Sequence, residues 1–311
     1  MRPLCECRAG PAREASDEGR VATISCAATR YRHPMAASPE LPRPTTLEEL
    51  LELEELDRDL YRAHNPRRPF TDHLYGGQVA AQALRAAGLT VPEGRTPHSM
   101  HCYYLRSGEA EQPTIMKVSR DRDGRSFSAR RVAALQRGEA IFTMSASFHV
   151  DEESGDWSGV PMLDVPSPAE LEGLGDRRIR SDDVLMEMRT IDPAPDDVAR
   201  QSASRFIWGR TRERLSDDRV LHAGAVVYLS DMSTGFADLD VVGLPRGGSS
   251  LDHTVYFHRP ARADEWMFMA LEPVSAAGAR GVYRGSVHDG SGRLLATLVQ
   301  ENLMRPWPEG G

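Results

Sequence analysis

The sequence predicts an α+β protein built from two similar halves. Residues 126–147 and 280–301 align without a gap at a shift of 154 residues, which places Arg130 on Arg284. Each half also has an apolar stretch followed by several alternating stretches, as expected for a helix followed by strands. A unit this long that is present twice indicates a duplicated domain rather than a solenoid.

The first half begins with a short helix. The stretch from Thr45 places three leucines on one face, has Thr45 or Thr46 as its cap, and is expected to end near Glu52. Residues 76–89 are apolar on most faces, which indicates a buried central helix. A strand-like segment precedes this helix and four strands follow it, the last two joined by a turn at Arg137-Gly138. These segments cover residues 59–63, 97–105, 114–121, 125–136 and 140–150.

The second half repeats this order with one ambiguity. Residues 220–230 form an apolar run that fits either a strand or a buried helix, and residues 231–239 occupy the place of the central helix. Asp231 is therefore expected at a helix start, where aspartate commonly acts as the cap. Four strands follow, at residues 251–258, 266–274, 278–288 and 294–304.

Composition divides the chain into four parts. Residues 1–43 have no sustained period and are expected to form a disordered tail, within which Met35 is a candidate true start. Residues 44–150 are expected to form the N-terminal domain, residues 151–195 a linker, and residues 196–306 the C-terminal domain. Short helices are expected within the linker at residues 169–174 and 182–188.

The bulk composition excludes several classes of protein. The 311 residues are 40% hydrophobic and 27% charged, which is ordinary for a globular protein with a sizeable core. A net charge of −8 argues against a general nucleic-acid binder. No apolar run approaches the roughly 20 residues that span a bilayer, and no apolar signal region is visible. A cytoplasmic protein without membrane insertion is therefore expected.

The four cysteines do not form a strong metal-binding pattern. Cys5, Cys7 and Cys26 lie in the expected tail and lack the usual spacing of zinc ligands, so a metal site there is the less favoured alternative. Cys102 lies in an apolar strand pattern, where a buried structural thiol is favoured over a nucleophile. We therefore expect no metal and no cofactor.

Several motifs occur in a characteristic order along both halves. The first half carries YGGQV at residues 75–79, then further motifs at residues 98–108 and 125–138. The second half carries Ser230-Asp231, a motif at residues 251–260, and VQE at residues 299–301. From about Leu47 to Arg305, the chain thereby resembles the type II acyl-CoA thioesterase family, the bacterial thioesterase II group. The resemblance implies a double hotdog fold, in which two fused hotdog domains each wrap an antiparallel sheet around a central helix.

The resemblance also implies an activity and three catalytic residues. Members of this family hydrolyse acyl-CoA to free fatty acid and CoA without a metal or cofactor. Their catalytic Asp, Thr or Ser, and Gln fall on Asp231, Ser250 and Gln300. Ser250 departs from the commoner bacterial threonine but keeps the hydroxyl. A carboxylate, a hydroxyl and an amide can together hold one water, whose proton Asp231 accepts.

Substrate contacts are expected at three further residues. Gly76 and Gly77 open the central helix, whose first N–H groups suit an oxyanion, although the residues after Asp231 are an alternative. Arg130 is expected to attract the phosphates of CoA. Arg131 and Arg259 are further candidates for this contact, although solvated sheet arginines are the default interpretation for all three. Structural hydrogen bonds are favoured for three strand histidines, His101, His253 and His258.

Each catalytic candidate also has an ordinary structural role. Asp231 suits a helix cap, Ser250 a loop hydroxyl and Gln300 an exposed strand position. Two other functions stay open: a non-catalytic acyl-CoA binding module, and a hotdog hydratase or dehydratase for enoyl thioesters. The latter class resembles this fold but uses a histidine near the helix start, and Asp231-Met-Ser-Thr contains none.

The resemblance implies a homodimer or homotetramer, and the repeat implies one site per chain. Gln300 aligns with Ala146, Ser250 aligns with His98, and Asp231 falls near Val79. The first half thus lacks the polar set that the second half carries.

Overall fold

The structure is a computed structural model that describes residues 44–65, 73–172, 185–191, 204–236 and 248–305. All of them lie within one unit, Pro42–Gly311. The expected tail, with Cys5, Cys7, Cys26 and Met35, lies outside the described residues. No helix in these ranges is long and apolar enough to cross a membrane.

The first half has the element order that its sequence predicts, except for an additional strand, Glu54–Asp57, between the first helix and the expected segment at residues 59–63. Thr46 caps the first helix by accepting a hydrogen bond from the backbone of Glu49, and Glu52 ends it. Arg137 and Gly138 have φ values of 51° and 82°, which confirms the expected tight turn between the last two strands. The elements are α1 (Leu47–Leu51), β1 (Glu54–Asp57), β2 (Leu60–Ala63), α2 (Gly76–Gly88), β3 (Arg95–Tyr104), β4 (Thr114–Asp123), β5 (Phe127–Gln136) and β6 (Glu139–Val150).

The second half corrects the expected position of its helix. The apolar run at residues 220–230 is a buried helix, whereas residues 231–236, expected to be helical, form turns and bends. Residues 186–188, expected to be helical, lie in a strand inside the expected linker, and a strand at Arg205–Thr211 was not predicted. The elements are α3 (Pro168–Glu172), β7 (Met186–Ile191), β8 (Arg205–Thr211), α4 (Arg219–Ser230), β9 (Asp252–Phe257), β10 (Met267–Ala277), β11 (Arg280–Asp289) and β12 (Leu294–Leu303).

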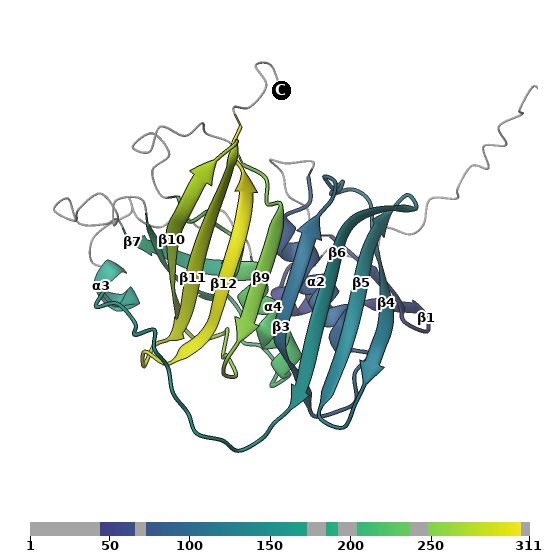
Figure 1. Cartoon of the computed structure of the whole chain (residues 1–311), viewed down its shortest axis with the longest axis horizontal. Coiled ribbons are helices and arrows are strands. Elements are labelled where there is room, and N and C mark those ends of the chain that lie inside the picture. The colour runs from purple at the N-terminus through teal and green to yellow at the C-terminus, as the bar shows by residue number, and fades with distance from the viewer. Residues whose placement is uncertain (1–43, 66–72, 173–184, 192–203, 237–247, 306–311) are drawn as a thin grey trace, which may run out of the picture. The chain divides into compact units, whose positions relative to one another are not determined.

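The two halves join edge to edge in one antiparallel sheet. The strand order is β1-β2-β4-β5-β6-β3-β9-β12-β11-β10-β8-β7, so the second half mirrors the first. Strands β3 and β9 pair at the centre, with His101 opposite Thr254, and lie side by side in Figure 1. This symmetric order confirms the duplication that the repeat predicts, and β7 is the counterpart of β1.

The two long helices pack against each other behind the sheet (Figure 1). The start of α2 lies against the end of α4, because the Tyr75 hydroxyl donates to the carbonyl oxygen of Tyr228 at 2.6 Å. A Cβ at Gly77 would lie 2.8 Å from that same oxygen, so glycine permits the close approach. This junction of the two halves positions the functional site.

Candidate active site

Asp231 lies where α4 ends, not where a helix begins. It is the C-cap of α4, and the helix instead starts at Asp218, whose carboxylate accepts hydrogen bonds from the backbones of Val220 and Leu221. The expected role of Asp231 as an N-cap is therefore wrong. The chain turns after Ser230 and carries the Asp231 carboxylate to the start of α2.

The three predicted catalytic side chains converge. Ser250 Oγ donates to Oδ1 of Asp231 at 2.8 Å, and Gln300 Nε2 donates to the same oxygen at 2.6 Å. Gln300 Nε2 also lies 2.7 Å from Ser250 Oγ. Ser250 forms an isolated β-bridge to Asn302, which holds it beside the strand that carries Gln300. The site thus joins the end of α4, the segment before β9, and β12.

Burial makes the Asp231 carboxylate a stronger base than an ordinary aspartate. Burial raises its pKa from 3.8 to about 6, although hydrogen bonds from Gln300, Ser250 and the Gly77 backbone lower it. The supporting contacts are neutral donors rather than cations. A carboxylate with this pKa is mostly ionised at neutral pH and well matched to accepting a proton there.

The three residues line a pocket of about 740 Å³. Gly76, at the start of α2, and Tyr104, at the end of β3, form part of the same wall. The pocket thus has contributions from both halves. Much of the remaining lining is apolar: Leu74, Val79, Leu105, Ile141 and Phe142.

The two glycines predicted to bind substrate both lie at the site. A Cβ at Gly76 would be 2.7 Å from Oδ2 of Asp231, so only glycine lets the helix start approach the carboxylate this closely. The backbone of Gly77 lies near the Asp231 carboxyl and lowers its pKa. The Gly76 N–H is therefore the donor from this pair that suits a substrate oxygen.

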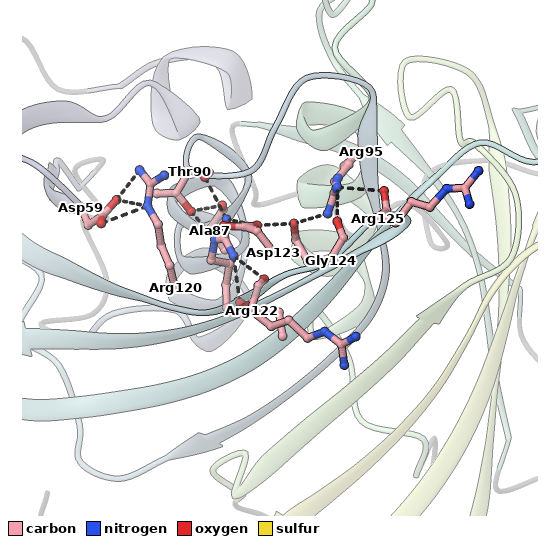
Figure 2. Close-up of polar contacts among 12 residues, drawn as sticks. Asp59, Ala87, Thr90, Arg95, Arg120, Arg122, Asp123, Gly124 and Arg125 are labelled. Atoms are coloured by element: carbon pink, nitrogen blue, oxygen red, sulfur yellow. Dashed lines mark hydrogen bonds and ion pairs between the residues drawn. The ribbon is translucent and has the colours of Figure 1, made fainter.

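Arg130, predicted to bind CoA phosphates, does not line this pocket. It is 1% exposed, and its guanidinium donates to the side chain and carbonyl of Thr90, to Asp123, and to the carbonyl of Arg122. Figure 2 shows these partners close to the end of α2. The prediction is wrong because Arg130 is a buried structural group that ties β5 to α2.

The other arginines that shared this expectation are also engaged elsewhere. Arg131 pairs with Asp121 and Arg259 pairs with Asp156. Arg106 is instead the described arginine in the wall of the 740 Å³ pocket; its side chain pairs with the exposed Glu139 and is 54% exposed. The sequence offered a signal for Arg106, since it lies in the motif at residues 98–108.

The histidines and the buried cysteine have structural partners, as expected. His101 bonds to Thr254, His258 to Thr297, and His253 to Ser230. Burial lowers the pKa of His253 to about 3, so it is a poor base. Burial raises the pKa of the Cys102 thiol, which keeps it protonated and unreactive.

The expectation that no histidine lies near the start of the second helix is wrong. The sequence predicted this helix after Asp231, whereas α4 precedes Asp231 and contains His222 in its first turn. His222 accepts a hydrogen bond from the backbone of Ala263 and does not line the 740 Å³ pocket. The histidine that does line this pocket, His73, is exposed at its mouth and bonds to Ser107.

The duplication gives a counterpart pocket of about 340 Å³. Residues of other types stand at the positions that correspond to Asp231, Ser250 and Gln300. His98, the repeat partner of Ser250, lines it. The C-cap of α2 is Leu89, so the structural counterpart of Asp231 is Leu89 and not a residue near Val79. Ala146 occupies the position that corresponds to Gln300 in the repeat.

Among the polar residues of the 740 Å³ pocket that were not predicted, two have a buried atom without a described hydrogen-bond partner. Asn302 is 3% exposed, and its Oδ1 has no hydrogen-bond partner among the described residues. Tyr104 carries a buried hydroxyl that likewise lacks a described partner. In the parts of the chain that the structure describes, no cluster of three or more His, Cys, Asp or Glu side chains is arranged to hold a metal ion.

Comparisons with known proteins cover both halves. Residues 64–149 match the family model of the acyl-CoA thioesterase N-terminal domain, and residues 163–304 match that of the C-terminal domain. Human acyl-coenzyme A thioesterase 8 is 34% identical over 84% of this chain and 89% of its own length. The structure of acyl-CoA thioesterase II TesB2 from Mycobacterium marinum aligns with a TM-score of 0.69 and 36% identity over 86% of this chain and all of its own.

A solved protein with a hot dog fold from Alicyclobacillus acidocaldarius is similar in fold. It aligns with a TM-score of 0.69 at 22% identity, over 84% of this chain and 98% of its own. The two sheet-and-helix halves described above correspond to the two units of a double hotdog.

Proposed function

The chain belongs to the acyl-CoA thioesterase family, and on this premise we propose that it hydrolyses acyl-CoA with a water held by Asp231, Ser250 and Gln300. One observation carries the assignment of these residues. The two donors meet on one carboxylate oxygen, at 2.6 and 2.8 Å, in the wall of a largely apolar pocket. If Asp231 were only a helix cap, Ser250 only a loop hydroxyl and Gln300 only an exposed strand residue, nothing would bring their side chains together in this way.

The proposed reaction needs no covalent enzyme intermediate, because a thioester is electrophilic and its thiolate is a good leaving group. The water oxygen bonds to the carbonyl carbon as Asp231 accepts a water proton. The carbonyl oxygen gains negative charge, which the Gly76 N–H at the positive end of α2 is placed to stabilise. The C–S bond then breaks, and the departing thiolate takes the proton from Asp231. Fatty acid and CoA are the products.

Ser250 and Gln300 position the carboxylate of Asp231, and Asp231 alone accepts the proton. Both donate to Oδ1, so Oδ2 is the oxygen of Asp231 that is left for the water. The apolar wall suits the acyl chain. At the rim, Arg106 rather than Arg130 is the cation suited to the phosphates of CoA.

A CoA-release assay tests this function. We expect the purified chain to release CoA from palmitoyl-CoA in the presence of a thiol reagent, and Asp231→Ala to slow release by about 10²-fold or more. The matched control is Asp121→Asn, which removes an exposed carboxylate paired with Arg131 and is expected to keep the rate. Tight acyl-CoA binding without release would indicate a binding module. Hydration of an enoyl-CoA without release would indicate a hydratase. Either result would overturn the proposal.

We also propose that the chain forms a homodimer or homotetramer and acts in the cytoplasm. Tyr103 and Tyr256 lie on the outer face of the central strands and are 52% and 51% exposed, which suits contact with a second copy. Light scattering after size-exclusion chromatography should give the mass of two or four chains, and a monomer would contradict this. Cell fractionation checks the compartment.

A further inference from the structure

A buried hydroxyl beside the proposed site has no described partner. Tyr104 is the last residue of β3, and its Oη is shielded from solvent without a hydrogen bond in the described part of the chain. Leaving a buried donor unpaired destabilises the fold. Phenylalanine would fill the same space without that cost, so the hydroxyl calls for an explanation in terms of function.

Tyr104 and Asp231 lie on either side of Gly76. A Cβ at Gly76 would be 2.7 Å from Oδ2 of Asp231, and 2.9 and 3.2 Å from Cε1 and Cζ of Tyr104. The phenol and the carboxylate are therefore separated by a single glycine. The side-chain donors to Asp231, Ser250 and Gln300, both reach Oδ1. On the Oδ2 side, the described residues supply no side-chain donor.

We propose that Tyr104 is a positioning residue that acts through Asp231, because its hydroxyl is the donor for the Oδ2 side of the carboxylate and favours its ionised form. The inference rests on the proposed role of Asp231 as the base. Hydrogen bonds of this kind are often long in an empty site and tighten when substrate fills it. Filling the pocket would therefore bring the unpaired donor and the carboxylate together.

The other titratable groups around Asp231 are already committed. Tyr75 donates to the carbonyl of Tyr228, Tyr283 from β11 donates to the carbonyl of Ser233, and Cys102 from β3 donates to the carbonyl of His253. Asp252, at the start of β9, adds a second negative charge that acts on Cys102 and Tyr283.

Three of these groups, Cys102, Tyr104 and Tyr283, are neutral at working pH. Burial, followed by the charge of Asp231, raises the pKa values of Cys102, Tyr104 and Tyr283 well above their ordinary values. Each therefore keeps its proton. Among these neutral donors, Tyr104 is the one whose hydroxyl reaches no described oxygen or nitrogen acceptor; the acceptor-type group near it is the Cys102 sulfur, which accepts only weakly.

The test is the pH dependence of kcat/KM for palmitoyl-CoA in full-length Tyr104→Phe. Losing a donor to the carboxylate should move the acid limb up by roughly 0.5–1 pH unit, which lowers the rate near pH 6 about two- to fivefold. The unfolding midpoint should stay the same or rise, because an unpaired hydroxyl is removed. The control is Tyr61→Phe, a tyrosine that is 6% exposed and lies outside the pocket, for which the wild-type acid limb is expected.

A purely structural hydroxyl would leave the acid limb of Tyr104→Phe unchanged, and that result would overturn the inference. Asp231→Asn in the same assay separates the two claims. If Asp231→Asn loses activity while Tyr104→Phe keeps the wild-type limb, the role of Tyr104 alone fails. If Asp231→Asn stays fully active, the proposed base fails.

A second variant covers the case in which Tyr104→Phe does not fold. Replacing Tyr104 with 3,5-difluorotyrosine keeps the ring and makes the hydroxyl a stronger donor. It should move the acid limb down. An unchanged limb would again overturn the inference.

Discussion

Nε2 of Gln300 lies 2.6 Å from Oδ1 of Asp231, although the two residues are 69 positions apart in the chain. The carboxylate fixes the orientation of the amide, because the amide oxygen would be repelled in that place. This single bond ties β12 to the end of α4. The polar set therefore belongs to the second half, while the first half contributes the glycine helix start that the carboxylate faces.

Asp231→Asn should be more stable than the wild type at pH 7.5. Burial raises the pKa of Asp231 from 3.8 to about 6, so the folded state binds more protons than the unfolded state between these values. Stability therefore falls as pH rises from about 4 to 6, by up to about 3 kcal/mol. Asparagine removes this cost and still accepts both hydrogen bonds. Denaturant unfolding should show a gain at pH 7.5 that vanishes near pH 4, and no gain at pH 7.5 would contradict the raised pKa.

Gly76→Ala should lower kcat/KM by about tenfold or more. Its Cβ would lie 2.7 Å from Oδ2 of Asp231 and 2.9 Å from Tyr104, so the carboxylate or the ring must move. Gly155→Ala is the matched control, since its Cβ would meet no atom within 4 Å. Steady-state kinetics on both variants checks this, and a wild-type rate for folded Gly76→Ala would refute the close fit.

Ser250→Thr should keep activity, whereas Ser250→Ala should lower kcat by roughly 10–10²-fold. Threonine retains the hydroxyl that donates to Asp231 at 2.8 Å and that lies 2.7 Å from Gln300. Alanine removes this hydroxyl, so Asp231 and Gln300 each lose a hydrogen-bond partner. Equal rates for the alanine and threonine variants would show that the hydroxyl has no part in the reaction.

Arg130→Met should destabilise the fold without changing substrate affinity. Removing the buried guanidinium leaves the carbonyl groups of Thr90 and Arg122 and the half-exposed Asp123 without their donor, a change that costs about 1–3 kcal/mol. The folded fraction should keep the wild-type KM. Arg106→Gln, in contrast, should raise KM with little loss of stability. A raised KM for Arg130→Met would restore the phosphate-binding role that its burial argues against.

Local sequence patterns were sufficient to predict most strands of the sheet. The β5–β6 hairpin follows from alternating residues and from a turn at Arg137-Gly138 that tolerates positive φ. Strand β8 was missed because four consecutive residues, from Phe206 to Gly209, are buried, so it does not alternate. Helix α4 stayed ambiguous for the same reason, since a run buried on every side has no period and only its packing on α2 decides its form.

The repeat did not predict how exposed each of two aligned residues is. Arg130 and Arg284 are repeat partners, yet Arg130 is 1% exposed while the side chain of Arg284 is 69% exposed. The convergence of Asp231, Ser250 and Gln300 was predicted through the family resemblance, because their spacing in sequence carries no such signal. The unpaired hydroxyl of Tyr104 depends on the arrangement of its neighbours and was not foreseeable from sequence.

The most direct test of Asp231 as the base is the rate of CoA release by the wild type and by Asp231→Asn across pH 5–8. The wild-type kcat/KM should rise with pH through a midpoint near 6, the pKa that burial gives this carboxyl. Asp231→Asn should be about 10²-fold slower or more and should lack that midpoint. A variant that keeps the wild-type rate, or the same midpoint, would contradict the assignment.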